Sequence, residues 1–99
     1  MLYAIIGRDC PGSLPIRTRI RPAHLERVRA LVEEGRLLVA GPFPAVDSAD
    51  PGPAGYTGSL IVAEFDSLED ARAWIATDPY VTEGVFEHYD VRPFRQVLP

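Results

Sequence analysis

The stretch that decides the fold is Ser59-Leu60-Ile61-Val62-Ala63-Glu64-Phe65, which predicts a β-strand. Side chains alternate between the two faces of a strand, so Leu60 and Val62 share one face. The other face carries Ile61, Ala63 and Phe65. Because both faces are apolar, both must be covered, and the sequence predicts a sheet packed on its two sides.

The elements on either side of this strand follow a strand–helix–strand order. Upstream, residues 2–8 are nearly all apolar and predict a first strand, a helix opens at Arg21-Pro22-Ala23-His24, and residues 37–41 predict a second strand. Downstream, Ser67 begins a second helix that Asp78-Pro79 stops, and a last strand covers residues 85–94. The order β-α-β-β-α-β is that of a ferredoxin-like α+β sandwich, formed by residues 1–99 as a single domain.

Two stretches rich in proline and glycine are expected to be irregular. Residues 9–20 contain Pro11, Gly12 and Pro15 and predict a loop before the first helix. Residues 42–58 form the longest irregular stretch, and a loop of that length is usually functional or disordered. In the first helix, the buried stripe is expected to consist of Leu25, Val28, Leu31 and Val32. Gly35 is expected to end this helix.

The two helices of this pattern can cover only one face of the sheet. Something else must bury the face that carries Leu60 and Val62. A second copy of the chain is the simplest cover, since most soluble oligomers are symmetric homodimers. We therefore expect a homodimer through the sheet face, a dimeric α+β barrel.

Composition excludes several classes of function. The 99 residues carry a net charge of −4, which argues against a nucleic-acid partner, and no apolar run is long enough to span a membrane. The N-terminus lacks the basic flank of a signal peptide, so a cytoplasmic location is expected. One cysteine and two histidines do not predict a metal site, and no nucleotide-binding motif occurs. We expect no cofactor.

Several short motifs are distributed along almost the whole chain. They are Arg21-Pro22-Ala23-His24-Leu25, Glu34-Gly35-Arg36-Leu37-Leu38, Ala40-Gly41-Pro42, Gly58-Ser59, Asp78-Pro79-Tyr80 and Val91-Arg92-Pro93-Phe94. Together these motifs resemble the YciI-like (YCII-related) family. The resemblance implies a ferredoxin-like fold that dimerises through its sheets, and a recurring histidine and aspartate that match His24 and Asp78. It implies an enzyme without naming a reaction. One similar protein removes chloride from a chlorinated hydroxyquinol, but a fold does not fix a function.

His24 and Asp78 are the candidate catalytic residues. His24 shares the helix face of Val28 and Leu31, and histidine suits proton transfer because its ordinary pKa is near neutral, about 6.5. A place in the first helical turn would keep its ring neutral. Asp78 would orient the ring and stabilise the imidazolium. The alternatives are a structural helical histidine and a simple Asp-Pro helix stop.

Four further residues are candidates for substrate binding. Gly41 and Pro42 follow the second strand, Ser59 starts the third, and Tyr80 follows the second helix. Each has a structural alternative: a turn, a loop end, or a core aromatic. His88 is expected on the strand face of Phe86 and Asp90, at the dimer contact, with a catalytic role as the alternative. Arg17, Arg19 and Arg21 could attract an anionic substrate, although a solvated loop is the simpler interpretation.

The sequence thus predicts a small cytoplasmic enzyme that uses a His24–Asp78 dyad for acid–base chemistry of a lyase or isomerase type. Its substrate would be a small organic molecule, cyclic or anionic, held between the helices, the sheet and residues 42–58. The alternative is a non-catalytic dimeric module that binds a metabolite or assists another enzyme.

Overall fold

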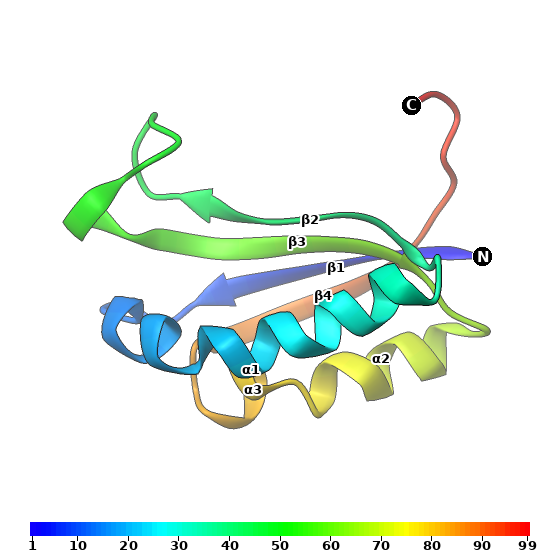
Figure 1. Cartoon of the computed structure of the whole chain (residues 1–99), viewed down its shortest axis with the longest axis horizontal. Coiled ribbons are helices and arrows are strands. Elements are labelled where there is room, and N and C mark those ends of the chain that lie inside the picture. Colours follow the sequence, from blue (N-terminus) through cyan, green and yellow to red (C-terminus); the bar gives the residue numbers. More distant parts are fainter.

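The computed structural model describes all residues from 1 to 99 and has the predicted ferredoxin-like α+β fold. Its elements in chain order are β1 (Leu2–Asp9), α1 (Leu14–Glu33), β2 (Leu37–Pro44), the 3₁₀ turn η1 (Gly52–Ala54), β3 (Tyr56–Glu64), α2 (Leu68–Ala76), α3 (Pro79–Thr82) and β4 (Phe86–Phe94). The strands form one antiparallel sheet in the order β2-β3-β1-β4. All three helices lie on one side of it (Figure 1). None of them is long and apolar enough to cross a membrane.

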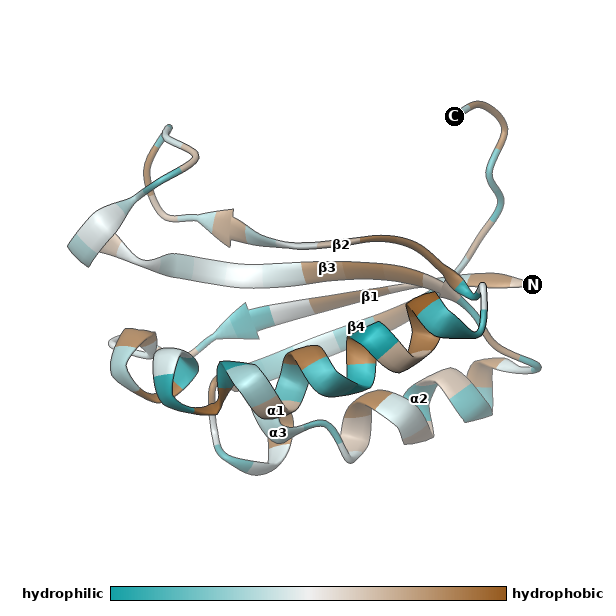
Figure 2. Ribbon diagram, in the orientation of Figure 1, coloured by the Kyte–Doolittle hydropathy of each residue, from teal (hydrophilic) through white to brown (hydrophobic).

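The hydrophobic core lies between the sheet and the helices. Ile5 from β1 and Ile61 from β3 face Leu31 of α1 and Ile75 of α2, and all four are almost fully buried. Figure 2 shows the matching pattern along the ribbon, with apolar stretches on the central strands and alternating apolar and polar bands around α1. The predicted face of Ile61 is therefore the helix-covered face.

The first helix begins earlier than predicted, at Leu14 and not at Arg21. The expectation of a loop over residues 9–20 was wrong. Pro15 lies in the first turn, where a missing N–H has no partner to lose. Pro22 lies inside the helix and removes only one backbone hydrogen bond. Burial of Arg17 and partial burial of Ile16 and Ile20 hold these first turns against the sheet.

This longer helix changes the environment of His24. The residue lies in the middle of a helix of 20 residues, not in its first turn. The field of the helix macrodipole falls off within the first and last turns. The argument that a helix N-terminus keeps the His24 ring neutral is therefore wrong. Val32, expected in the buried stripe, is exposed, whereas Gly35 follows the helix with a positive φ of 69° as predicted.

The second and third strands are also longer than predicted, so the irregular stretch is shorter than residues 42–58. β2 continues through Pro44, and β3 begins at Tyr56. Both prolines of β2 are tolerated because β2 is an edge strand of the sheet. Gly58 lets β3 approach β1 closely, since a Cβ there would collide with the carbonyl oxygen of Gly7.

A β-bulge corrects the predicted face of His88. The register between β1 and β4 shifts between Arg8 and Asp9, so Arg8 pairs with His88 while Asp9 pairs with Phe86. Phe86 therefore lies in the core under the helices, while His88 and Asp90 are exposed on the other face. His88 Nε2 lies 3.4 Å from Asp90 Oδ1 on that surface.

Candidate active site

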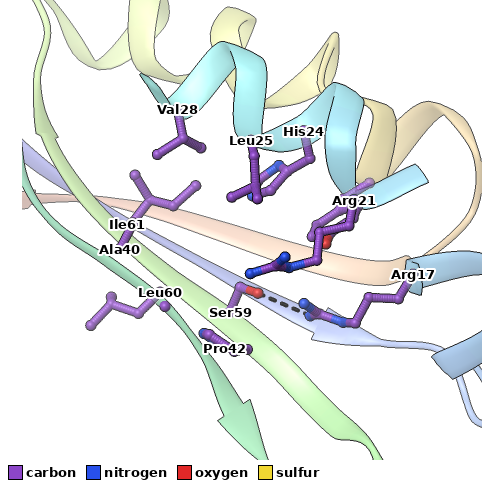
Figure 3. A pocket seen from close by; sticks show the side chains of 12 residues that line it. Arg17, Arg21, His24, Leu25, Val28, Ala40, Pro42, Ser59, Leu60 and Ile61 are labelled. Carbon is purple, nitrogen blue, oxygen red and sulfur yellow. Dashed lines mark hydrogen bonds between the residues drawn. The ribbon is translucent and has the colours of Figure 1, made fainter. Parts of the chain in front are cut away.

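A cavity of about 130 Å³ lies between α1 and the strands β2 and β3. Its polar lining comes from Arg17, Arg21, His24, Ser59 and Tyr80. Leu25 and Val28 of α1 and Ile61 of β3 form its apolar wall (Figure 3). A cavity of about 150 Å³ holds a benzene molecule, so this volume suits one single-ring compound.

His24 and Asp78 are in direct contact beside this cavity. His24 Nδ1 lies 2.8 Å from Asp78 Oδ2, and the exposed fractions of the two side chains are 8% and 0%. The sequence had placed the end of α2 at Asp78, but α2 ends at Ala76 and Asp78 is the N-cap of α3. Its Oδ2 accepts a hydrogen bond from the backbone N–H of Tyr80 at 3.0 Å. Its other oxygen, Oδ1, accepts a hydrogen bond from Arg27 Nη1 at 2.9 Å. The carboxylate is thus fully partnered and held in one orientation.

The contact with Asp78 selects the tautomer of His24. An ionised carboxylate only accepts hydrogen bonds, so Nδ1 carries the proton and donates it to Asp78. In the neutral ring Nε2 then has a free lone pair, and it has no hydrogen-bond partner within the protein. Every fully buried polar side-chain atom of the protein has a hydrogen-bond partner. Since Nε2 has none, it is not fully buried, and it is open to the cavity that His24 lines. The arrangement leaves one basic nitrogen available to a bound molecule.

Tyr80 forms the platform beneath His24. The two rings are stacked, with centroids 4.0 Å apart and planes 11° from parallel. Burial raises the pKa of Tyr80 above its ordinary value of 10.0, and the guanidinium groups of Arg17 and Arg21 only partly oppose this effect. Tyr80 is therefore a neutral phenol at physiological pH.

A second buried cluster, centred on Arg17, was missed by the sequence analysis. Arg17 Nε and Nη2 each lie 2.9 Å from a carboxylate oxygen of Asp9, and Ser13 Oγ donates to the same carboxylate at 2.6 Å. Arg17 Nη2 also donates to Ser59 Oγ at 2.9 Å. The interpretation of Arg17 as part of a solvated loop was wrong. The spacing of residues 17, 21, 24 and 28 is that of one helix face and would have signalled the cluster had the helix been recognised.

The structure brings the predicted site residues together. Gly41, Pro42, Ser59 and Tyr80 line the same cavity as His24, and Asp78 lies directly behind His24. Gly41 and Pro42 lie within β2 and not after it, and Ser59 lies inside β3 and not at its start. Nowhere in the chain do three His, Cys, Asp or Glu side chains converge in the manner of a metal site.

Comparison with known proteins identifies the family. The model of the YCII-related domain matches residues 1–95. The chain belongs to the YCII-related family. It is 59% identical over 98 residues to Protein YciI of Escherichia coli O6:H1, covering 99% of this chain and 100% of that protein.

Two more distant relatives have descriptive names. The chain is 39% identical over 75 residues to the "derivative of benzaldehyde biosynthesis cluster protein C" of Emericella nidulans, covering 72% of this chain and 74% of that protein. It also resembles the solved 5-chloro-2-hydroxyhydroquinone dehydrochlorinase (TftG) of Burkholderia phenoliruptrix AC1100, in complex with 2,5-dihydroxybenzoquinone. That match has a TM-score of 0.83 and 27% identity, and it covers 96% of this chain and 94% of the other.

Proposed function

We propose that this YCII-related protein is an enzyme that performs acid–base chemistry on a single-ring organic molecule. The observation that carries the proposal is the 2.8 Å contact between His24 Nδ1 and Asp78 Oδ2 beside a cavity. In this scheme Nε2 of His24 removes a proton from the substrate, and Asp78 stabilises the imidazolium that forms. Asp78 does not itself take the proton.

The relatives support an elimination or isomerisation. Loss of HCl from a chlorinated hydroquinone, the activity named for TftG, transfers a proton to a base and releases chloride without an external oxidant. One open imidazole nitrogen supplies that base. The name of the Emericella nidulans protein, which refers to a derivative of benzaldehyde biosynthesis cluster, is a second link to small aromatic molecules. Lyase or isomerase chemistry therefore fits the site.

The other cavity residues would position the substrate. Ser59 Oγ, already an acceptor for Arg17, can donate its own proton to a substrate oxygen. The Tyr80 phenol and the backbone of Gly41 and Pro42 form further parts of the wall. We expect substitutions of Ser59 to raise KM more than they lower kcat, because they weaken binding and leave the base in place.

The test is chloride release from 5-chloro-2-hydroxyhydroquinone, followed with the wild type and matched variants. His24→Asn and Asp78→Asn should each lower the rate by about 100-fold or more, as expected for loss of a general base or its partner. His88→Asn is the control, because His88 also lies beside an aspartate but on the opposite, exposed face. Equal rates for His24→Asn and the wild type would reject the mechanism. Binding without turnover by the wild type would favour a metabolite-binding module.

The same proposal includes a homodimer formed through the face of the sheet that has no helices. Ile6, Val39, Phe43 and Phe94 are exposed there, each with more than a third of its surface open to solvent. The register places Leu60 beside Ile6 on this face. Large apolar side chains exposed together on one face are typical of a protein–protein interface.

A further inference from the structure

The charged groups around the cavity do not balance. Arg17 is neutralised by Asp9, whose two carboxylate oxygens it contacts at 2.9 Å. Asp78 is paired with Arg27, also at 2.9 Å, and the His24 ring adds no charge when it is neutral. Arg21 remains, and it forms no ion pair with any carboxylate of the chain. The cavity therefore carries one uncompensated positive charge.

No acidic residue of the chain forms an ion pair with Arg21. Its neighbours one turn away on α1 are Arg17, Thr18, His24 and Leu25. Asp50 borders the adjoining hollow, but its carboxylate accepts the backbone N–H of Gly52 and makes no pair with Arg21. Figure 3 shows the Arg21 side chain reaching from α1 across the cavity, above Ser59. A cation kept free at this place is available to a ligand.

Arg17 offers a second donor to the same space. Its Nε and Nη2 atoms bind Asp9, Ser59 and the carbonyl oxygen of Gly58. Nη1 takes part in none of these hydrogen bonds. The Arg17 side chain is only 6% exposed, yet it lines the cavity, and no fully buried polar atom of the protein is left without a partner. Nη1 therefore faces accessible space from a rigidly held guanidinium.

We propose that the cavity binds a single-ring organic monoanion, and that Arg21 pairs with its negative group. The ligand would carry a carboxylate or an ionised enol, with a charge of one to match the free guanidinium. Arg17 Nη1 would donate a second hydrogen bond to the same oxyanion or to its neighbour. The ring would pack on Leu25, Val28 and Ile61. This inference specifies the substrate class of the proposed enzyme, but binding of the anion does not require proton transfer by His24.

The test measures the affinities of benzoate and of its neutral isostere benzamide by titration calorimetry or NMR. The two probes share a ring and differ in charge. Because a charge-assisted hydrogen bond is about twice as strong as a neutral one, we expect benzoate to bind at least about tenfold more tightly. Arg21→Gln should remove this preference by weakening benzoate and sparing benzamide. Arg19→Gln, an equal charge change on an exposed position of the same helix, should change neither affinity by more than about twofold.

Three results would overturn the proposal. The first is equal affinity for benzoate and benzamide, and the second is no saturable binding of benzoate. The third is an equal loss of benzoate affinity in Arg21→Gln and Arg19→Gln, which would indicate only a long-range electrostatic effect of the positive charges. The outcome is separable from that of the acid–base mechanism. His24→Asn should keep the benzoate preference while it loses turnover, so a catalytically intact His24→Asn variant would refute the mechanism alone. Both arginine variants alter exposed positions, and thermal melts should match the wild type within a few degrees.

Discussion

The ring of His24 lies flat on the ring of Tyr80, with their centroids 4.0 Å apart. This stack fixes the plane of the imidazole, while the hydrogen bond to Asp78 fixes its rotation within that plane. Tyr80 is itself held by Asp78, which accepts the Tyr80 backbone N–H. One aspartate therefore positions both the histidine and the platform beneath it, and the open Nε2 atom has a defined direction.

Tyr80 should make the protein sensitive to alkali. Its pKa is raised by burial, so the folded state favours the neutral phenol. Below a pH of about 10 the phenol is neutral in both the folded and the unfolded protein, and the contribution of Tyr80 to the free energy of unfolding is fully present. As the pH rises further, the unfolded chain releases the proton more readily, and the free energy of unfolding falls. Urea melts between pH 8 and 11 should show this decline, and Tyr80→Phe should reduce it.

Tyr89→Phe is the control for the alkaline experiment, since Tyr89 is a half-buried tyrosine of β4 outside the cavity. This variant should retain the alkaline decline of the wild type. An identical decline in Tyr80→Phe would show that the phenol of Tyr80 is not its source.

Asp78→Asn should destabilise the fold as well as impair the site. The amide cannot offer an ionised oxygen to both His24 and Arg27, and it leaves a partly buried guanidinium unpaired. We expect a loss of about 2–4 kcal/mol in the free energy of unfolding, measured by urea denaturation. Asp90→Asn breaks the exposed pair with His88 and should cost less than about 0.5 kcal/mol. Similar losses in both variants would contradict the role of Asp78 as a buried anchor.

The order of the four strands and the two long helices follows from the sequence, because each core strand is a compact apolar run between turn residues, whereas the short helix α3 was not predicted. The boundaries of α1 do not follow so directly. Pro15 and Pro22 suggest a loop or the start of a helix, whereas in the structure both lie within α1, which tertiary contacts stabilise. A local pattern cannot reveal that Asp9 will bury Arg17 and so stabilise the turns between the two prolines. The β-bulge between Phe86 and His88 is likewise invisible without the partner strand.

The candidate site was predictable to a similar degree. His24, Asp78, Ser59 and Tyr80 come from motifs of the family, and the fold places all four within one neighbourhood. The basic residues of the site were harder to predict from the sequence than these four residues. Arg17 and Arg21 belong to the site only if residues 14–20 are helical, since the helix aligns them with His24. Arg27 could not be assigned to Asp78 without knowledge of how α1 and α3 pack.

The ion pair of Arg17 and Asp9 should be a main structural anchor of the helix start. Both side chains are buried, so Arg17→Met leaves the Asp9 carboxylate buried without its cation. We expect a loss of about 3–5 kcal/mol, the cost of breaking a buried ion pair, measured by urea denaturation. Arg8→Met is the control, because Arg8 pairs with Glu87 at the surface and should cost less than about 1 kcal/mol. Equal costs would show that burial adds nothing to the Arg17 pair.

The proposed homodimer can be tested with two valines that have similar exposure on opposite sides of the molecule. Val39 of β2 is 49% exposed on the sheet face without helices, and Val32 of α1 is 56% exposed on the helical side. Val39→Asp places a charge within the proposed interface, where desolvation without a partner is costly, and should give a monomer in light scattering at micromolar concentration. Val32→Asp should remain a dimer. A wild type that is monomeric at this concentration, or a dimer that survives Val39→Asp unchanged, would contradict the assignment of this face.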